Sequence, residues 1–183
     1  MIYNQIIGAC WIAFFALWFV LAVRRNTGRS TQSPGSIWLR LVLVAAALLG
    51  GVLISRFPEL TFGRYASSIA GAGCALCVAG LVFGAWARVA IGRSWGMPMT
   101  LHEKPELVTA GPYGFVRHPI YTGLSAMAVG TTLVYPVMVL WCVAMLTYLI
   151  ISARREERDM ALRFPDTYPA YSQRSKMLVP FVL

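Results

Sequence analysis

Long apolar runs constrain this chain more than any other feature. A membrane-spanning helix needs about 20 apolar residues to cross a hydrocarbon layer of about 30 Å, and a helix satisfies its own backbone groups there. With mean hydropathy +0.64 and only 13% charged residues, the chain is predicted to be all-α, a polytopic membrane protein with about five transmembrane helices. The runs extend over residues 3–23, 37–54, 66–90, 119–134 and 136–153.

The last two runs are about 16 and 17 residues long, which is short for a full span. Pro136 stands between them, so they are predicted to form a helical hairpin with a tight turn. Residues 91–117 carry three prolines and are expected to form an irregular loop, and residues 154–183 are expected to begin as an amphipathic helix at the interface. In the third run, Gly80 and Gly84 are predicted to allow close approach of a neighbouring helix.

The basic residues predict how the helices are oriented. With the N-terminus outside, all 16 Lys and Arg residues except Arg56 and Arg64 fall on the cytoplasmic side, as the positive-inside rule requires. We therefore expect an inner- or plasma-membrane protein whose 91–117 loop and C-terminal segment are cytoplasmic. The net charge of +9 is explained by this topology, and no nucleic-acid partner is expected.

The cysteines and histidines give no reason to expect a metal. All four cysteines lie inside apolar runs, and the C-x-x-C pair Cys74 and Cys77 has no second pair or histidine at zinc-site spacing. They are predicted to be packing residues. The two histidines, His102 and His118, are too few for a histidine-cluster metal enzyme, and phosphate-binding glycine loops are absent from the sequence.

Two polar clusters flank the hairpin. The first, G-P-Y-G-F-V-R-H-P-I-Y-T-G, spans residues 111–123 at the start of the fourth run, and the second, R-R-E-E-R-D, begins at Arg154 just after the fifth. A hairpin returns both to one membrane face, where the positive helix N-terminus suits a carboxylate or phosphate and the glutamates suit an ammonium or ribose diol. A zwitterionic nucleoside cofactor such as S-adenosylmethionine needs both kinds of partner. Taken singly, the same residues also fit membrane anchors and surface ion pairs.

The motifs resemble a known family. The 111–123 motif, then R-R-E-E-R, F-x-x-x-Y-x-x-Y from Phe164 and L-V-P from Leu178 are similar to the isoprenylcysteine carboxyl methyltransferase family, whose C-terminal core the phospholipid N-methyltransferases share. The resemblance covers roughly residues 105–180. It implies an integral-membrane methyltransferase that uses S-adenosylmethionine, releases S-adenosylhomocysteine and lacks a Rossmann domain. Residues 1–183 are then one membrane domain, with 1–90 as a three-helix scaffold and 91–183 as the catalytic core.

The resemblance also implies roles for particular residues. The family's substrate-facing arginine corresponds to Ser152 here, so Arg154, or else Arg155, is expected to hold the acceptor, and Glu157 or His118 is the candidate base for an amine acceptor. Arg154 and Glu157 are thus the expected catalytic residues. The residues expected to bind the cofactor are Pro105, Glu106, Leu107, Val108, Tyr113, His118, Pro119, Ile120, Tyr121 and Glu156.

The expected acceptor is a lipophilic small molecule or lipid. Our first hypothesis is the carboxylate of an isoprenylcysteine-like molecule, and the second is the amine of an ethanolamine-type phospholipid. A rival hypothesis from another class is a non-catalytic membrane scaffold, which would have no affinity for the cofactor.

Overall fold

The structure is a computed structural model in which residues 2–23, 67–92 and 107–179 are described. These residues contain no β-strand, apart from one isolated bridge between Val116 and Lys176. The predicted all-α fold is confirmed. The helices are α1 (Ile2–Val23), α3 (Ser67–Ile91), α4 (Pro119–Val134), α5 (Val139–Arg163) and α6 (Tyr168–Arg174), with the 3-10 turns η3 (Gly111–Gly114) and η4 (Pro136–Met138).

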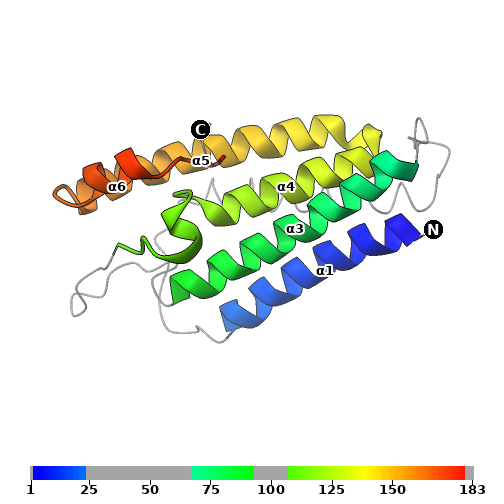
Figure 1. Cartoon of the computed structure of the whole chain (residues 1–183), viewed down its shortest axis with the longest axis horizontal. Coiled ribbons are helices and arrows are strands. Elements are labelled where there is room, and N and C mark those ends of the chain that lie inside the picture. The colour runs from blue at the N-terminus through cyan, green and yellow to red at the C-terminus, as the bar shows by residue number, and fades with distance from the viewer. Residues whose placement is uncertain (1, 24–66, 93–106, 180–183) are drawn as a thin grey trace.

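The four long helices lie side by side in the order α1, α3, α4, α5, and α6 follows the polar end of α5 (Figure 1). Three helical stretches of the described part are long and apolar enough to cross a membrane, Ile2–Leu21, Ser67–Ile91 and Pro136–Arg163, while Pro119–Val134 is a shorter apolar helix. η4 provides the turn expected at Pro136. The span predicted over residues 37–54 lies outside the described residues.

Glycines bring α3 and α4 into backbone contact. A Cβ added to Gly80 would stand 2.5 Å from the Gly123 carbonyl oxygen, and one added to Gly73 would stand 2.7 Å from the Gly130 oxygen. A Cβ added to Gly84 would stand 3.8 Å from the Gly123 Cα, in ordinary contact. Small residues allow this approach between membrane helices because dispersion contacts increase as the backbones close. The close packing predicted from Gly80 and Gly84 is confirmed.

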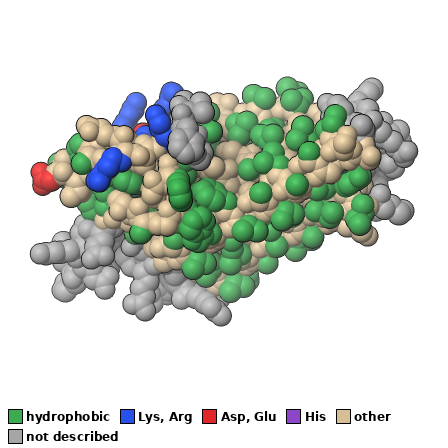
Figure 2. Space-filling view, viewed as in Figure 1, with side chains coloured by type: hydrophobic (Ala, Val, Ile, Leu, Met, Phe, Trp, Pro, Cys, Tyr) green, Lys and Arg blue, Asp and Glu red, His purple; other side chains and the backbone are tan. Residues whose placement is uncertain are grey.

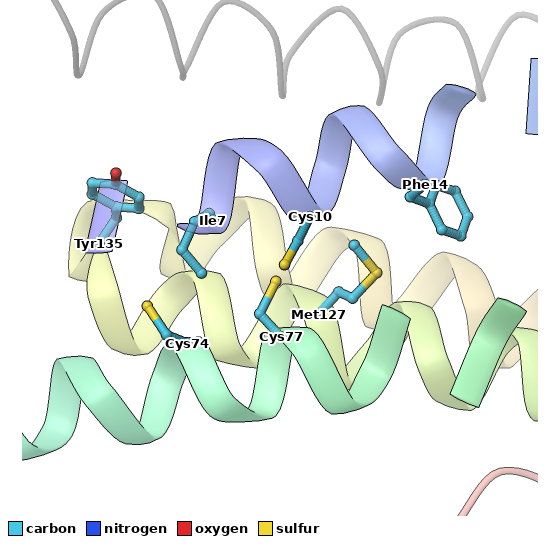
Figure 3. Close-up of a cluster of buried hydrophobic side chains, with 7 residues drawn as sticks. All are labelled: Ile7, Cys10, Phe14, Cys74, Cys77, Met127 and Tyr135. Atoms are coloured by element: carbon cyan, nitrogen blue, oxygen red, sulfur yellow. The ribbon is translucent and has the colours of Figure 1, made fainter. Parts of the chain in front are cut away.

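A buried cluster joins α1 to the α3–α4 pair (Figure 3). Cys74 and Cys77 lie in it as packing residues, as predicted, and all four cysteines are buried and free. The Trp11 indole N–H donates to Thr131 Oγ1 at 3.0 Å, which satisfies a polar pair between α1 and α4. The cluster therefore packs α1 and α3 against α4. Its buried members are Ile7, Cys10, Phe14, Cys74, Cys77, Met127 and Tyr135.

Helix α5 is longer than the sequence predicted. The apolar run ends at Ala153, and a separate interfacial helix was expected after it, but α5 continues without a break to Arg163. The reason is local. Residues 154–163 include many strong helix formers and neither Gly nor Pro, and Pro165 stands just beyond the helix end. The second polar cluster is thus a rigid extension of a membrane helix.

Candidate functional site

The polar clusters of α4 and α5 meet at one end of the bundle. The arms from His118 to Tyr135 and from Val139 to Glu156 contain the same number of residues, so at about 1.5 Å per residue each is about 26 Å long. The hairpin therefore returns Glu156 to the level of His118. His118 Nδ1 lies 3.5 Å from Glu156 Oε2, and Nε2 lies 3.6 Å from Glu157 Oε1. The predicted meeting of the two clusters is confirmed.

The surrounding surface agrees with this placement. On the face drawn in Figure 2, Lys, Arg, Asp and Glu side chains gather at the end formed by α6 and the polar part of α5, while hydrophobic side chains are spread over the described helices away from that end. Helix α3 has one charged residue, Arg88, in its last turn, and α1 has none. The described helices thus form an apolar bundle with one charged end.

His118 is held between two carboxylates. Its side chain is 10% exposed, its backbone N–H donates to the Met177 carbonyl at 3.1 Å, and its ring stacks on Tyr121 with centroids 5.6 Å apart. Burial lowers the pKa of His118, but the two adjacent carboxylates outweigh burial and leave this pKa above its usual value. The Tyr121 hydroxyl donates to Glu156 Oε1.

Glu157 faces Arg117 as well as His118. The Arg117 Nε–H donates to Glu157 Oε1 at 2.6 Å, and the two side chains are 13% and 23% exposed. A carboxylate paired with a guanidinium is a weaker base. The geometry therefore favours His118 over Glu157 for any proton transfer, and the catalytic role of Glu157 stays a prediction.

A polar pocket of about 400 Å³ opens beside this pair, between α5, α6 and the C-terminal segment. Arg154 lines it, whereas Arg155 does not, so the geometry favours Arg154 as the acceptor-facing arginine. Lys176 contributes a second exposed cation from the far end of the chain. The lining residues are Arg117, Arg154, Glu157, Ser172, Gln173, Ser175, Lys176 and Met177.

Several of the other predicted cofactor residues form an apolar wall. Tyr113 and Ile120 are buried against Ala87 of α3, with Val108 packed beside them. Burial raises the pKa of the Tyr113 phenol, so it stays neutral. Pro119 is buried too, Leu107 is half-buried, and Pro105 and Glu106 lie outside the described residues. Direct contact of these residues with a cofactor stays a prediction.

Sequence reasoning missed the contribution of the C-terminal segment. It runs parallel to the residues before α4: the Arg117 N–H donates to the Lys176 carbonyl at 2.7 Å, and Thr122 Oγ1 donates to the Leu178 carbonyl at 2.5 Å. The Tyr171 hydroxyl donates to the Tyr113 carbonyl at 2.7 Å. The F-x-x-x-Y-x-x-Y and L-V-P motifs marked these residues, but no local pattern reveals a backbone contact at such separation.

Arg88, one of the basic residues used to predict the orientation, is buried. Its residue is only 3% exposed, and its Nη1 donates to the Gly92 carbonyl at 3.3 Å. It lies close enough to Tyr113 for its charge to oppose the rise in that phenol's pKa. The cation therefore belongs to the inner wall of the site.

Comparisons with known proteins identify related sequences. Two relatives are a methanethiol S-methyltransferase 1 from Bradyrhizobium diazoefficiens, 34% identical over 77 residues, and a methanethiol S-methyltransferase from a Pseudomonas species, 32% identical over 78 residues. The alignments cover 42% and 43% of this chain but only 27% and 30% of those proteins. The phospholipid methyltransferase family profile matches residues 69–167, more than half of the chain and nearly all of the α3–α5 unit that carries the polar cluster. The chain belongs to the phospholipid methyltransferase family.

Proposed function

We propose that this protein is an S-adenosylmethionine-dependent methyltransferase that modifies a lipophilic acceptor at the membrane. The observation that carries the proposal is the cluster of His118, Tyr121, Glu156 and Glu157 at the polar end of an apolar bundle. The His118 side chain is only 10% exposed beside two carboxylates, and buried titratable groups with charged partners often mark functional sites. Family membership supports the same reaction class.

The residues present fit such a cofactor. The Glu156 side chain is 46% exposed, so beyond Tyr121 and His118 its carboxylate has acceptor positions for an ammonium or a ribose diol. The apolar wall of Tyr113, Ile120 and Val108 suits an adenine ring. When bound, the cofactor supplies an electrophilic methyl group on a positively charged sulfur.

The protein contributes by positioning the two reactants and excluding water. Methyl transfer requires the acceptor nucleophile to lie in line with the methyl group at about 3 Å, and alignment of this kind supplies much of the rate enhancement. Rigid α5 fixes both glutamates, and the hairpin fixes their distance from His118. The acceptor's lipid part is expected to enter laterally from the bilayer.

The charge of the pocket supports an anionic nucleophile. Arg154 and Lys176 are exposed cations in the pocket, whereas the charges of Arg117 and Glu157 offset one another. A carboxylate is already ionised at neutral pH and needs only a cation to hold it, which Arg154 offers in a bidentate geometry. The carboxylate of an isoprenylcysteine-like molecule is therefore our first candidate acceptor.

A thiol is the second candidate, because two relatives are named methanethiol S-methyltransferases. A thiolate is also anionic, so the same cations would stabilise it. The amine of an ethanolamine-type phospholipid fits least well. It is cationic before it reacts, and both Arg154 and Lys176 repel it.

Cofactor binding tests the proposal directly. S-adenosylhomocysteine titrated into the detergent-solubilised protein should bind, and Glu156→Ala and His118→Ala should weaken it by on the order of 2 kcal/mol, or about 30-fold in Kd. Asp159→Ala removes an exposed carboxylate from the same helix and should leave Kd unchanged. Wild-type protein without affinity would support the scaffold hypothesis. A screen of carboxylate, thiol and amine acceptors with methyl-labelled cofactor then identifies the acceptor.

A further inference from the structure

Arg117 joins three parts of the chain that are distant in sequence. Its Nε–H donates to Glu157 of α5 at 2.6 Å. Its Nη1 donates to the Ser172 carbonyl in α6 at 2.9 Å and to the Ser175 carbonyl just after α6. Its own backbone N–H pairs with Lys176. One side chain therefore connects the entry to α4, the polar end of α5 and the C-terminal segment.

We propose that Arg117 is a positioning residue, which anchors Glu157 of α5 and the C-terminal segment against the start of α4. The inference rests on the proposed function, because the residues it positions are those expected to bind the cofactor. Arg117 acts through other groups, since its Nε and Nη1 donors are already occupied by protein acceptors.

The chemistry of the side chain explains why arginine suits this position. The three acceptors are a carboxylate and two backbone carbonyls, and they are bound by two different nitrogens of one planar group. A guanidinium presents five donors in a fixed fork, whereas a lysine ammonium is a single point of charge. Lysine would keep the charge beside Glu157 but lose the fixed geometry that also holds the two carbonyls.

His118 reports whether Glu157 is held in this way. The groups that face its ring are Glu156 and Glu157 from α5 and the stacked Tyr121 from α4. Arg117 shares the Glu157 carboxylate with His118, and this competition limits how much Glu157 stabilises the imidazolium. Removing Arg117 should therefore raise the pKa of His118, and removing the charge of Glu157 should lower it.

The experiment uses the ring signals of histidine in the full chain. The protein has two histidines, so selective ¹³C labelling yields two titration curves, and His102→Gln assigns them. Arg117→Gln should shift the His118 titration upward, and Glu157→Gln should shift it downward. Arg163→Gln removes an exposed cation from the same helix as Glu157, and it should shift the His118 titration much less than either of these variants. An unchanged His118 titration in Arg117→Gln would overturn the proposal.

Kinetics provide the second measurement. Arg117→Lys should lower kcat by on the order of 10–100-fold, because a displacement near 1 Å costs up to this much, with a smaller change in KM for the acceptor. A kcat equal to the wild-type value in Arg117→Lys would refute a positioning role. If both Arg117 variants failed to fold, the role of Arg117 would be structural and the proposal would be wrong. If the wild type shows no methyl transfer, the proposed function fails, while the His118 titrations still test the arrangement around Arg117.

Discussion

Gly80→Ala should loosen the bundle and disturb the site together. The new Cβ would stand 2.5 Å from the Gly123 carbonyl oxygen, 2.9 Å from Ala126 Cβ and 2.9 Å from the Met127 nitrogen. None of these three atoms moves by a change of rotamer, because two belong to the backbone and the third is a Cβ. Since ordinary contact begins near 3.4 Å, α3 and α4 must separate by about 0.9 Å at this point.

The magnitude follows from two opposing contributions. Overpacking of this kind costs about 1–3 kcal/mol, whereas replacing Gly by Ala in a helix contributes up to about 1 kcal/mol of stability. The net expectation is a loss of up to about 2 kcal/mol in the free energy of unfolding. Gly123 lies about one turn beyond His118 in α4, so the separation also displaces His118 relative to Glu156, and affinity for S-adenosylhomocysteine should fall with stability.

The matched control is Gly71→Ala. Gly71 lies in the same helix, but a Cβ there meets nothing within 4 Å, so only the helix-propensity gain remains. The free energy of unfolding is measured by denaturant titration in detergent micelles, and Kd by calorimetry on the same preparations. If Gly80→Ala proved as stable as Gly71→Ala and bound the ligand equally well, the close α3–α4 packing could not be what positions the site.

Three further predictions concern orientation, pH and the acceptor. A reporter active only in the cytoplasm should be active when fused at Leu183 and inactive near Glu59, both outside the described residues, because the basic residues favour that orientation; the reverse pattern would reject it. The raised pKa of His118 stabilises the fold fully below the usual value of 6.5 and progressively less as pH rises through the higher folded-state pKa. His118→Asn should therefore abolish this decrease of the free energy of unfolding with pH. If the decrease stayed the same in the variant, another titrating group would be its cause. For a carboxylate acceptor, kcat should be nearly flat from about pH 6 to 9 and Arg154→Lys should impair turnover, whereas a steep alkaline rise with an unaffected Lys variant would indicate an amine.

Much of the fold followed from local properties of the chain. The apolar runs predicted α1, α3, α4 and the apolar part of α5 to within a few residues, because membrane thickness sets the length of a span. Pro119 and Pro136 stand at the helix start and the turn that they predict. The predicted end of α5 was wrong. A change from apolar to polar residues marks the edge of the hydrocarbon layer, not the end of a helix.

The site was only partly accessible to the same reasoning. The hairpin predicted that His118 and the glutamates meet, since arms of equal length return to one level. Whether Glu156 or Glu157 faces Tyr121 was not predictable. A difference of one residue rotates a side chain by about 100° around the helix, and the rotation of α5 against α4 is set by packing.

The sequence by itself determined the membrane class, the helical hairpin and the residue types gathered at its polar end. These follow from hydropathy, proline and charge, which act locally. The tertiary structure alone decided that Arg117 pairs with Glu157, that Arg88 is buried, and that the C-terminal segment lies against the entry to α4. These contacts join residues far apart in the chain, and their geometry depends on how the helices pack, which no local pattern encodes.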